Sequence, residues 1–383
     1  MKIPFAQPWI TNNEIKRVQG VLNSRWLVQG KEVQNFEKEF SNYVGSKYAC
    51  AVSSCTAALH LSLKSLGVGV GDEVITVSHS YISTANSIKY CRAKPVFVDI
   101  NKATFNIDPD LIEKSITKKT KAILCVHQMG MPCDLKKIKD IAKKYKLYLV
   151  EDCACALGSE IQINKKMFKI GKPIGDIACF SFHPRKIITT GEGGMLTTNN
   201  KKLYEKFILW RQHSMNFSTF ERHSSNQIIF EQYKDVGFNY RITDIQASIG
   251  RSQLSRVEMI IKKRRNIAKF YNQNLKDNKY ITIPLEPSWC KSNFQSYCIN
   301  ISPKFKQKEV MLKLLNKGIS TRRGIMCAHL EPAYKSEFKF YKRKELIKSK
   351  SARNHSILLP MYYELTKNQQ SYIISTLKNI IKY

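Results

Sequence analysis

The chain has 383 residues, of which 43% are hydrophobic and 24% charged. This length can bury a large core, and we expect one large and one small domain. No apolar run approaches the length of a membrane span, and the first residues lack the apolar stretch of a signal peptide, so we expect no membrane insertion.

The formal net charge of +33 comes from 63 lysines and arginines against 30 acidic residues. Charge alone favours an anionic partner, such as nucleic acid, a membrane surface or a nucleotide. The lysines are spread over the whole chain without a basic tail, however, which is typical of solvated helix faces and compositional bias. We therefore expect no nucleic-acid partner, although the charge would assist capture of a nucleotide diphosphate.

Eleven cysteines are scattered along the chain without any Cys-x-x-Cys pair. Cys153 and Cys155 are separated by one residue, which is a poor spacing for zinc. The cysteines indicate reduced thiols used as small apolar residues, a cytoplasmic location and no metal site.

Helices and strands alternate along the first 200 residues. Residues 12–23 predict a helix capped by Asn12 or Asn13, and Asp108 with Pro109 predicts another helix start. Further helices are expected after Ser54, over about 83–90 and over 135–144. Short apolar runs predict the strands 48–52, 73–77, 95–98, 122–126, 147–150 and 177–182.

This alternation predicts a three-layer α/β domain with a largely parallel sheet. Residues 240–275 are mostly helical, and from about 290 the pattern changes to strands and helices with fewer apolar runs. We assign residues 1–250 to the large domain and 251–383 to a small C-terminal α+β domain. The N-terminal segment could pack on the small domain.

Polar groups follow two of the predicted strands in the middle of the chain. The strand at 147–150 leads to Asp152, and the strand at 177–182 carries Ser181, with Lys186 just beyond it. Open α/β sheets bind ligands at the carboxyl ends of their strands. A lysine to bond an aldehyde, a carboxylate for a ring nitrogen and a hydroxyl for a phosphate are the groups that pyridoxal 5′-phosphate (PLP) requires.

The blocks Glu151-Asp152-Cys153-Ala154, Phe180 to Lys186 and Gly191-Glu192-Gly193-Gly194-Met195 resemble those of the DegT/DnrJ/EryC1/StrS family of PLP-dependent nucleotide-sugar aminotransferases. Other blocks of that family follow in order, so the resemblance covers about residues 3–380. It implies an aspartate-aminotransferase-like fold, PLP fold type I, and a homodimer with shared active sites. The family usually has Gln or His where this chain has Cys155, and Gly where it has Cys55.

The resemblance also implies roles for individual residues. Lys186 and Asp152 would be catalytic, and the same two residues would bind PLP together with Thr56, Ala57, Tyr81, Ser181 and Asn239. In relatives, the residue matching Asn239 reaches the cofactor phosphate of the neighbouring subunit. Weaker matches place His183, Arg322, Arg323 and His329 at the substrate, and His127 near the ring. From the residues alone, without the resemblance, Asp134 and Thr243 are expected to cap helices and Gly130 is expected to permit a special turn.

The favoured function is transfer of an amino group from glutamate or glutamine to a nucleotide-linked keto sugar. A 4-keto-6-deoxy sugar is expected, giving a 4-amino sugar for a surface glycan, with a 3-keto sugar as the nearest competitor. One alternative is a sugar dehydratase of the same fold, although family dehydratases replace the lysine by histidine. Another is a non-catalytic regulator or nucleic-acid-binding protein, which the intact Lys186, Asp152 and Ser181 disfavour. The sequence leaves the sugar, its nucleotide and the donor open.

Overall fold

The structure is a computed structural model that describes residues 2–217, 227–228, 230–338 and 346–382. Its larger part is built on a seven-stranded sheet with the strand order β1-β9-β8-β5-β4-β2-β3. All neighbours are parallel except β9, which runs antiparallel to both β1 and β8. The strands are β1 (Tyr48–Val52), β2 (Glu73–Val77), β3 (Lys94–Val98), β4 (Thr120–Val126), β5 (Tyr148–Asp152), β8 (Ile177–Ser181) and β9 (Gly194–Thr198).

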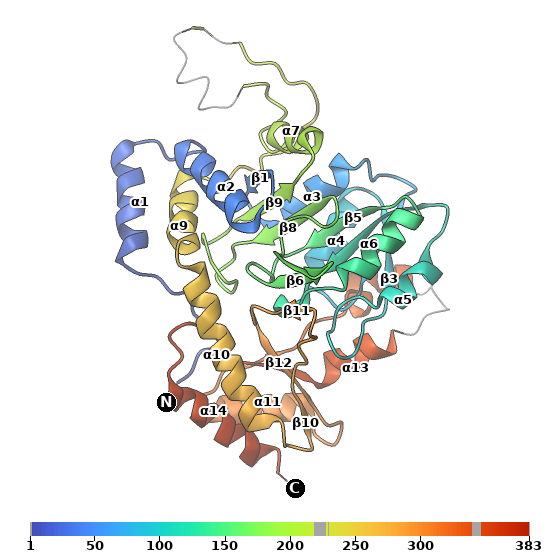
Figure 1. Cartoon of the computed structure of the whole chain (residues 1–383), viewed down its shortest axis with the longest axis vertical. Coiled ribbons are helices and arrows are strands. Elements are labelled where there is room, and N and C mark those ends of the chain that lie inside the picture. Colours follow the sequence, from blue (N-terminus) through green and yellow to red (C-terminus); the bar gives the residue numbers. More distant parts are fainter. Residues whose placement is uncertain (1, 218–226, 229, 339–345, 383) are drawn as a thin grey trace.

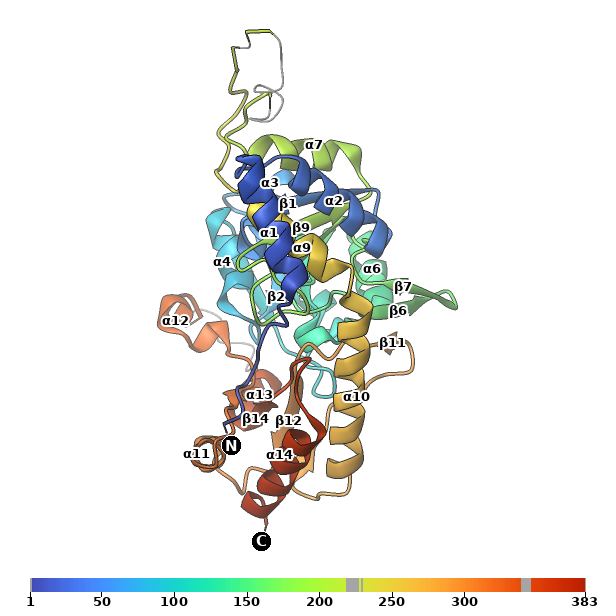
Figure 2. The ribbon, with the colours of Figure 1, turned by 90° about the vertical axis from the view of Figure 1, so that its left-hand side faces the viewer.

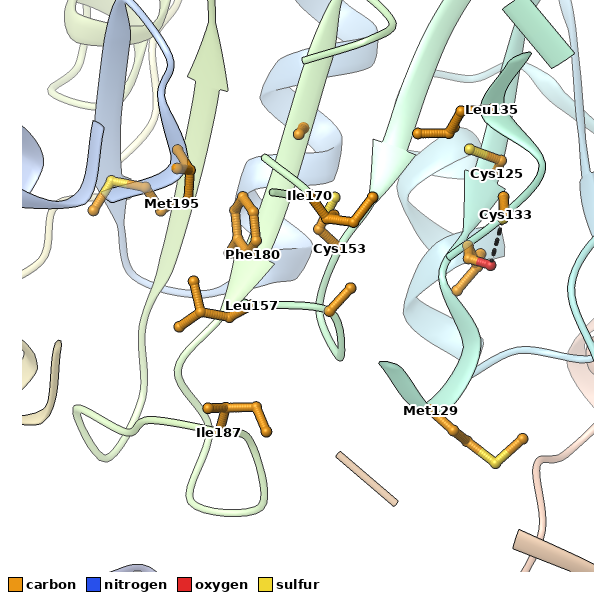
Figure 3. Close-up of a cluster of buried hydrophobic side chains, with 14 of the residues drawn as sticks. Cys125, Met129, Cys133, Leu135, Cys153, Leu157, Ile170, Phe180, Ile187 and Met195 are labelled. Atoms are coloured by element: carbon orange, nitrogen blue, oxygen red, sulfur yellow. Dashed lines mark hydrogen bonds between the residues drawn. The ribbon is translucent and has the colours of Figure 1, made fainter. Parts of the chain in front are cut away.

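Helices cover both faces of this sheet, because successive side chains of each strand point to opposite faces. In β1, for example, Ala51 packs on one face and Cys50 on the other. One face is covered by α2 (Lys31–Val44) and α6 (Leu135–Lys144), and the other by α3 (Cys55–Ser65), α4 (Ile82–Tyr90) and α7 (Lys201–Trp210). Figure 3 shows part of the first cluster, where Phe180 and Met195 lie among buried aliphatic side chains. The predicted three-layer α/β fold is therefore confirmed.

The C-terminal part has a core of its own around a four-stranded sheet with the order β10-β12-β14-β13. The strands are β10 (Ile281–Thr282), β12 (Tyr297–Ile301), β13 (Arg322–Arg323) and β14 (Ser356–Leu359); all neighbours are antiparallel. The helices include α11 (Gln307–Asn316), α12 (Pro332–Phe338), α13 (Ile347–His355) and α14 (Lys367–Ile380). Ile3 is fully buried in this core and bridges Ile319, so the N-terminal segment packs on the small part.

Two helices connect the parts. Helix α9 (Asp244–Leu254) packs against α1 (Asn12–Ser24) and α2, and α10 (Val257–Leu275) runs from the large part to the small one, as Figures 1 and 2 show. Thr243 caps α9 as predicted, with its hydroxyl accepting from the N–H of Gln246. The cap predicted for α1 was wrong: Thr11, not Asn12 or Asn13, caps the helix, and its partner Glu14 completes a capping box.

A third, three-stranded sheet joins the two parts on one side. It consists of β7 (Lys166–Lys169), β6 (Glu160–Ile163) and β11 (Cys290–Lys291), in antiparallel pairs. The chain reaches this sheet directly after β5, so the segment between β5 and β6 lies at the carboxyl edge of the main sheet. Within the described residues, no helix is long and apolar enough to cross a membrane.

Candidate active site

The candidate active site lies at the carboxyl edge of the parallel strands. β5 ends at Asp152 and β8 at Ser181, two strands that are hydrogen-bonded neighbours. β9 begins at the same edge with Gly194, which pairs with Ser181. The loop between β8 and β9 carries Lys186. The topology thus brings the predicted acid, hydroxyl and lysine to one edge.

Lys186 points back toward the end of β5. Its backbone N–H donates to the carbonyl of His183, and its Nζ donates to Cys155 Sγ at 3.2 Å. Burial alone would lower the pKa of Lys186, but the contact with Cys155 and the nearby Cys55 and Asp152 outweigh burial and raise this pKa above its ordinary value. The amine therefore holds a proton readily.

Asp152 is almost fully buried, and its carboxylate is oriented by two donors. Thr84 Oγ1 donates to Oδ2 at 2.9 Å, and the N–H of Ala154 donates to Oδ1 at 3.1 Å. Burial raises the pKa of Asp152, while these hydrogen bonds and the charge of Lys186 act against the increase. A cationic partner in the site would stabilise its charged form further.

A buried pair, His127 and Glu151, lies behind Asp152. The sequence predicted a role for His127 but none for Glu151. The N–H of Cys133 donates to His127 Nδ1 at 2.9 Å, so the ring proton sits on Nε2, which faces Glu151 Oε2 at 3.3 Å. Glu151 Oε1 accepts from the N–H groups of Ile174 and Gly175. Both nitrogens of His127 are thus engaged within the protein. The sequence feature that could have identified Glu151 was a carboxylate within an otherwise apolar strand.

These residues also raise the question of a metal. One ligand atom each of His127, Glu151 and Cys153 lies within 4.8 Å of the others, all fully buried. The His127 ring and the Glu151 carboxylate already have hydrogen-bond partners, and these contacts explain the arrangement without an ion.

The turn before α3 can hold an anion. The first four N–H groups of a helix have no partner within the helix. Here Ser54 Oγ accepts from Ala57 and Ser54 O from Ala58, which leaves the N–H groups of Cys55 and Thr56 for a ligand. Of the two predicted residues, Thr56 therefore offers its N–H and hydroxyl, whereas the N–H of Ala57 is taken.

A glycine opposite this turn is required by the packing. A Cβ on Gly194 would lie 2.5 Å from the carbonyl carbon and oxygen of Ser54, so only glycine lets β9 start this close to α3. Cys55, which stands where relatives have Gly, fits with its side chain buried and its Sγ 4.0 Å from Asp152 Oδ1.

Tyr81, Ser181 and His183 also lie near this edge. Tyr81 directly precedes α4, in the N-cap position, and is 65% exposed, so its ring has a free face. The hydroxyl of Ser181 accepts from the N–H of His183 at 3.4 Å. Burial, followed by the charge of Arg185, lowers the pKa of His183, which favours its neutral form.

Asn239 is exposed, and within the described residues its side chain has no hydrogen bond. Its backbone forms an antiparallel bridge with Gln212, and the next residue, Tyr240, accepts from the N–H of Ser53 through its carbonyl. The Asn239 block is therefore joined to the turn before α3 of its own chain.

The structure separates the three predicted substrate residues of the small part. Arg322 lines a pocket of about 560 Å³, to which Arg185 also belongs. Arg323, the next residue of β13, points away from it toward Glu331, 3.9 Å away. His329 is buried, and its Nδ1 is 2.5 Å from Ser78 Oγ, at the end of β2. This contact ties the small part to the large one.

The residues at the sheet edge fit PLP. The α3 turn suits a phosphate, Asp152 a protonated ring nitrogen, Lys186 an aldehyde carbon, and the exposed ring of Tyr81 a flat aromatic partner.

Comparison with known proteins agrees with this geometry. The sequence model of the DegT/DnrJ/EryC1/StrS aminotransferase family matches residues 8–378. GDP-perosamine synthase of Escherichia coli O157:H7 is 35% identical over 98% of this chain and 97% of its own. The structure of Helicobacter pylori PseC, an aminotransferase involved in pseudoaminic acid biosynthesis, has a TM-score of 0.90 at 30% identity and 99% coverage of both chains. The PLP form of Spr1654 from Streptococcus pneumoniae has a TM-score of 0.90 at 28% identity, covering 99% of this chain and 98% of its own.

Proposed function

The chain belongs to the DegT/DnrJ/EryC1/StrS aminotransferase family and is a PLP-dependent sugar aminotransferase; on that basis we propose that it transfers the amino group of glutamate or glutamine to a nucleotide-linked keto sugar. The observation that carries this proposal is the grouping of Lys186, Asp152 and the α3 turn at one sheet edge. A cytoplasmic location is proposed with it, on the grounds that all eleven cysteines are free.

Each residue of the site has a part in this reaction. Bound PLP supplies a ring that accepts electron density from the carbon that loses or gains a proton. Asp152, fixed by Thr84 and Ala154, keeps the ring nitrogen protonated. Lys186 Nζ would hold the cofactor at its aldehyde carbon, and as a free amine it would take the proton from the donor carbon and return it. The raised pKa of Lys186 suits an amine that must keep this proton between the two transfers.

The two alternative functions have less support. A sugar dehydratase of this family would carry histidine at position 186, whereas this chain has lysine. A non-catalytic regulator would not require the Asp152 carboxylate, which two donors orient, beside the Lys186 amine. Burying such charged groups costs free energy, which favours a catalytic role for them.

The 560 Å³ pocket lined by Arg185 and Arg322 supports a nucleotide-linked substrate. Its charged rim consists of Arg185, Lys308 and Arg322, its hydroxyls come from Ser320 and Thr321, and its apolar wall includes Phe5, Met311, Leu312 and Leu315. A diphosphate suits the cations and a base suits the apolar wall. Arg185, which precedes Lys186 in the loop between β8 and β9, is the lining residue that links this pocket to the segment carrying the reacting lysine.

Arg322→Ala is expected to raise KM for the nucleotide sugar about tenfold, which corresponds to ~1.4 kcal/mol. The reason is the loss of a cation that can pair with the diphosphate. The matched control is Arg323→Ala, since Arg323 faces Glu331 instead of the pocket; its KM should stay within about twofold. Steady-state kinetics of the two variants measures this, and equal effects would contradict the assignment of Arg322 to the substrate.

We propose a 4-keto-6-deoxy sugar as the acceptor and a 4-amino sugar for a surface glycan as the product. The pyridoxamine-loaded enzyme should react with a nucleotide-linked 4-keto sugar from a panel of keto sugars, and NMR of the product should show nitrogen on C4. An amine on C3, or reaction with free keto acids only, would overturn the substrate while leaving the PLP assignment intact.

We also propose a homodimer with shared sites. The segment before Asn239 has several exposed apolar side chains, namely Ile228, Phe230, Tyr233 and Val236. Its described residues extend away from the body of the molecule in Figure 1. Apolar side chains in such a position favour contact with a partner chain.

Mixing inactive Lys186→Ala protein with inactive Asn239→Ala protein should restore activity. If Asn239 serves the partner's site, a hybrid dimer contains one site with both residues intact. The measurement is turnover after subunit exchange, with formation of the hybrid verified by two affinity tags and each variant alone as the control. Verified hybrids without activity would rule out the shared site.

A further inference from the structure

The amine of Lys186 is in contact with a sulfur atom. Lys186 Nζ donates to Cys155 Sγ at 3.2 Å, and Cys155 is the one cysteine of the eleven that is not fully buried. Cys155 is thus half-buried at the sheet edge where Lys186 and Asp152 meet.

The loop that carries Cys155 is held rigidly. Asn293 Nδ2 donates to the carbonyl oxygens of Cys155 and Leu157, at 2.9 and 2.8 Å. The N–H of Ala156 donates to the carbonyl of Cys153 at 2.9 Å. Asn293 is fully buried and comes from the segment before β12, a position that the sequence did not single out. The backbone that carries the sulfur is thus held in place by hydrogen bonds.

Several charged or titratable groups face the Lys186 amine. Cys155 and Asp152 come from the end of β5, Cys55 from the start of α3, and His183 from the same loop as Lys186. Arg185 precedes Lys186 and has its side chain in the neighbouring pocket. Burial lowers the pKa of Lys186, and Cys155 is the foremost of the groups that reverse this effect.

We propose that Cys155 is a positioning residue of the transamination: its sulfur is the resting contact of the Lys186 amine whenever that nitrogen is not bonded to the cofactor. This inference rests on the aminotransferase function, because only there is the lysine released and recaptured in every cycle. The sulfur keeps the freed amine at the end of β5, beside Asp152, and stabilises the protonated form that the amine has between the two proton transfers. A protonated amine cannot bond the cofactor aldehyde, so the same contact slows capture of PLP.

The test is the rate at which cofactor-free protein bonds PLP, followed by stopped-flow absorbance from about pH 6 to about pH 10. Cys155→Ala should bond PLP at least about threefold faster than the wild type near neutral pH, since removing the acceptor lowers the pKa of the amine and leaves more of it unprotonated. The difference in the rate of PLP capture between Cys155→Ala and the wild type should narrow as the pH rises. Cys155→Ser keeps a hydroxyl that can accept from the amine, so its rate of PLP capture should stay closer to the wild type than that of Cys155→Ala. Cys91→Ala, at a buried cysteine away from Lys186, should match the wild type.

Two results would overturn the proposal: capture rates of Cys155→Ala and wild type that coincide at every pH, or slower capture in Cys155→Ala. Circular dichroism checks that each variant is folded. If Cys155→Ala is unfolded, the comparison of Cys155→Ser with the wild type decides the outcome. The assay contains neither amino donor nor sugar, so a wrong substrate assignment would leave its outcome unchanged.

Discussion

Lys186→Ala is expected to lower transamination at least about a thousandfold, which corresponds to ~4 kcal/mol of activation free energy. The loss is large because one nitrogen has two tasks, bonding the cofactor and transferring the proton. No other lysine is hydrogen-bonded beside Asp152 within the described residues; Lys186 reaches this place through its contact with Cys155. The variant should still bind PLP at the α3 turn, but without a covalent bond.

The measurement is the half-reaction with the amino donor, combined with borohydride reduction and peptide mapping. In the wild type, the reduced cofactor should be found on the peptide that contains Lys186. Lys186→Arg keeps the positive charge but stays protonated, so it should be equally inactive. Lys166→Ala, on the outer strand β7, should have wild-type activity and serves as the control. Label on a different lysine would refute the assignment.

The sequence predicted the central sheet well because its signals are local. The strands β1 and β2 begin and end at the predicted residues, as does helix α6. Buried parallel strands are short runs of apolar residues, and turn or cap residues such as Asp134 mark where helices begin. Strand-end polar groups then placed Asp152 and Lys186 at one edge, because parallel strands share their carboxyl edge.

Other features had no local signal. The strand β7 consists largely of lysine and exposed positions, and it exists because it pairs with β6. The antiparallel direction of β9 depends on its neighbours, which its own residues do not encode. The contacts of Asn293 with Cys155 join positions more than 130 residues apart. The separation of Arg322 from Arg323 follows from strand geometry, but only once β13 is known to be a strand.

Asp152→Asn is expected to retain PLP but to turn over at least tenfold more slowly, which corresponds to about 1.4 kcal/mol or more of activation free energy. Asparagine is nearly isosteric and can still accept from Thr84 or Ala154, so the fold should be kept. A neutral amide cannot stabilise a protonated ring nitrogen, however, and the ring then accepts less electron density during the proton transfer.

The decisive comparison is between Asp152→Asn and Thr84→Val. Both change the same group of hydrogen bonds at the end of β5, but only the first removes the charge. Single-turnover kinetics with the amino donor should show a large decrease for Asp152→Asn and a smaller one for Thr84→Val, with similar PLP content in both. If the two variants slowed equally, Asp152 would act through the architecture of the strand end. If Asp152→Asn turned over like the wild type, its carboxylate would have no electrostatic role in the reaction.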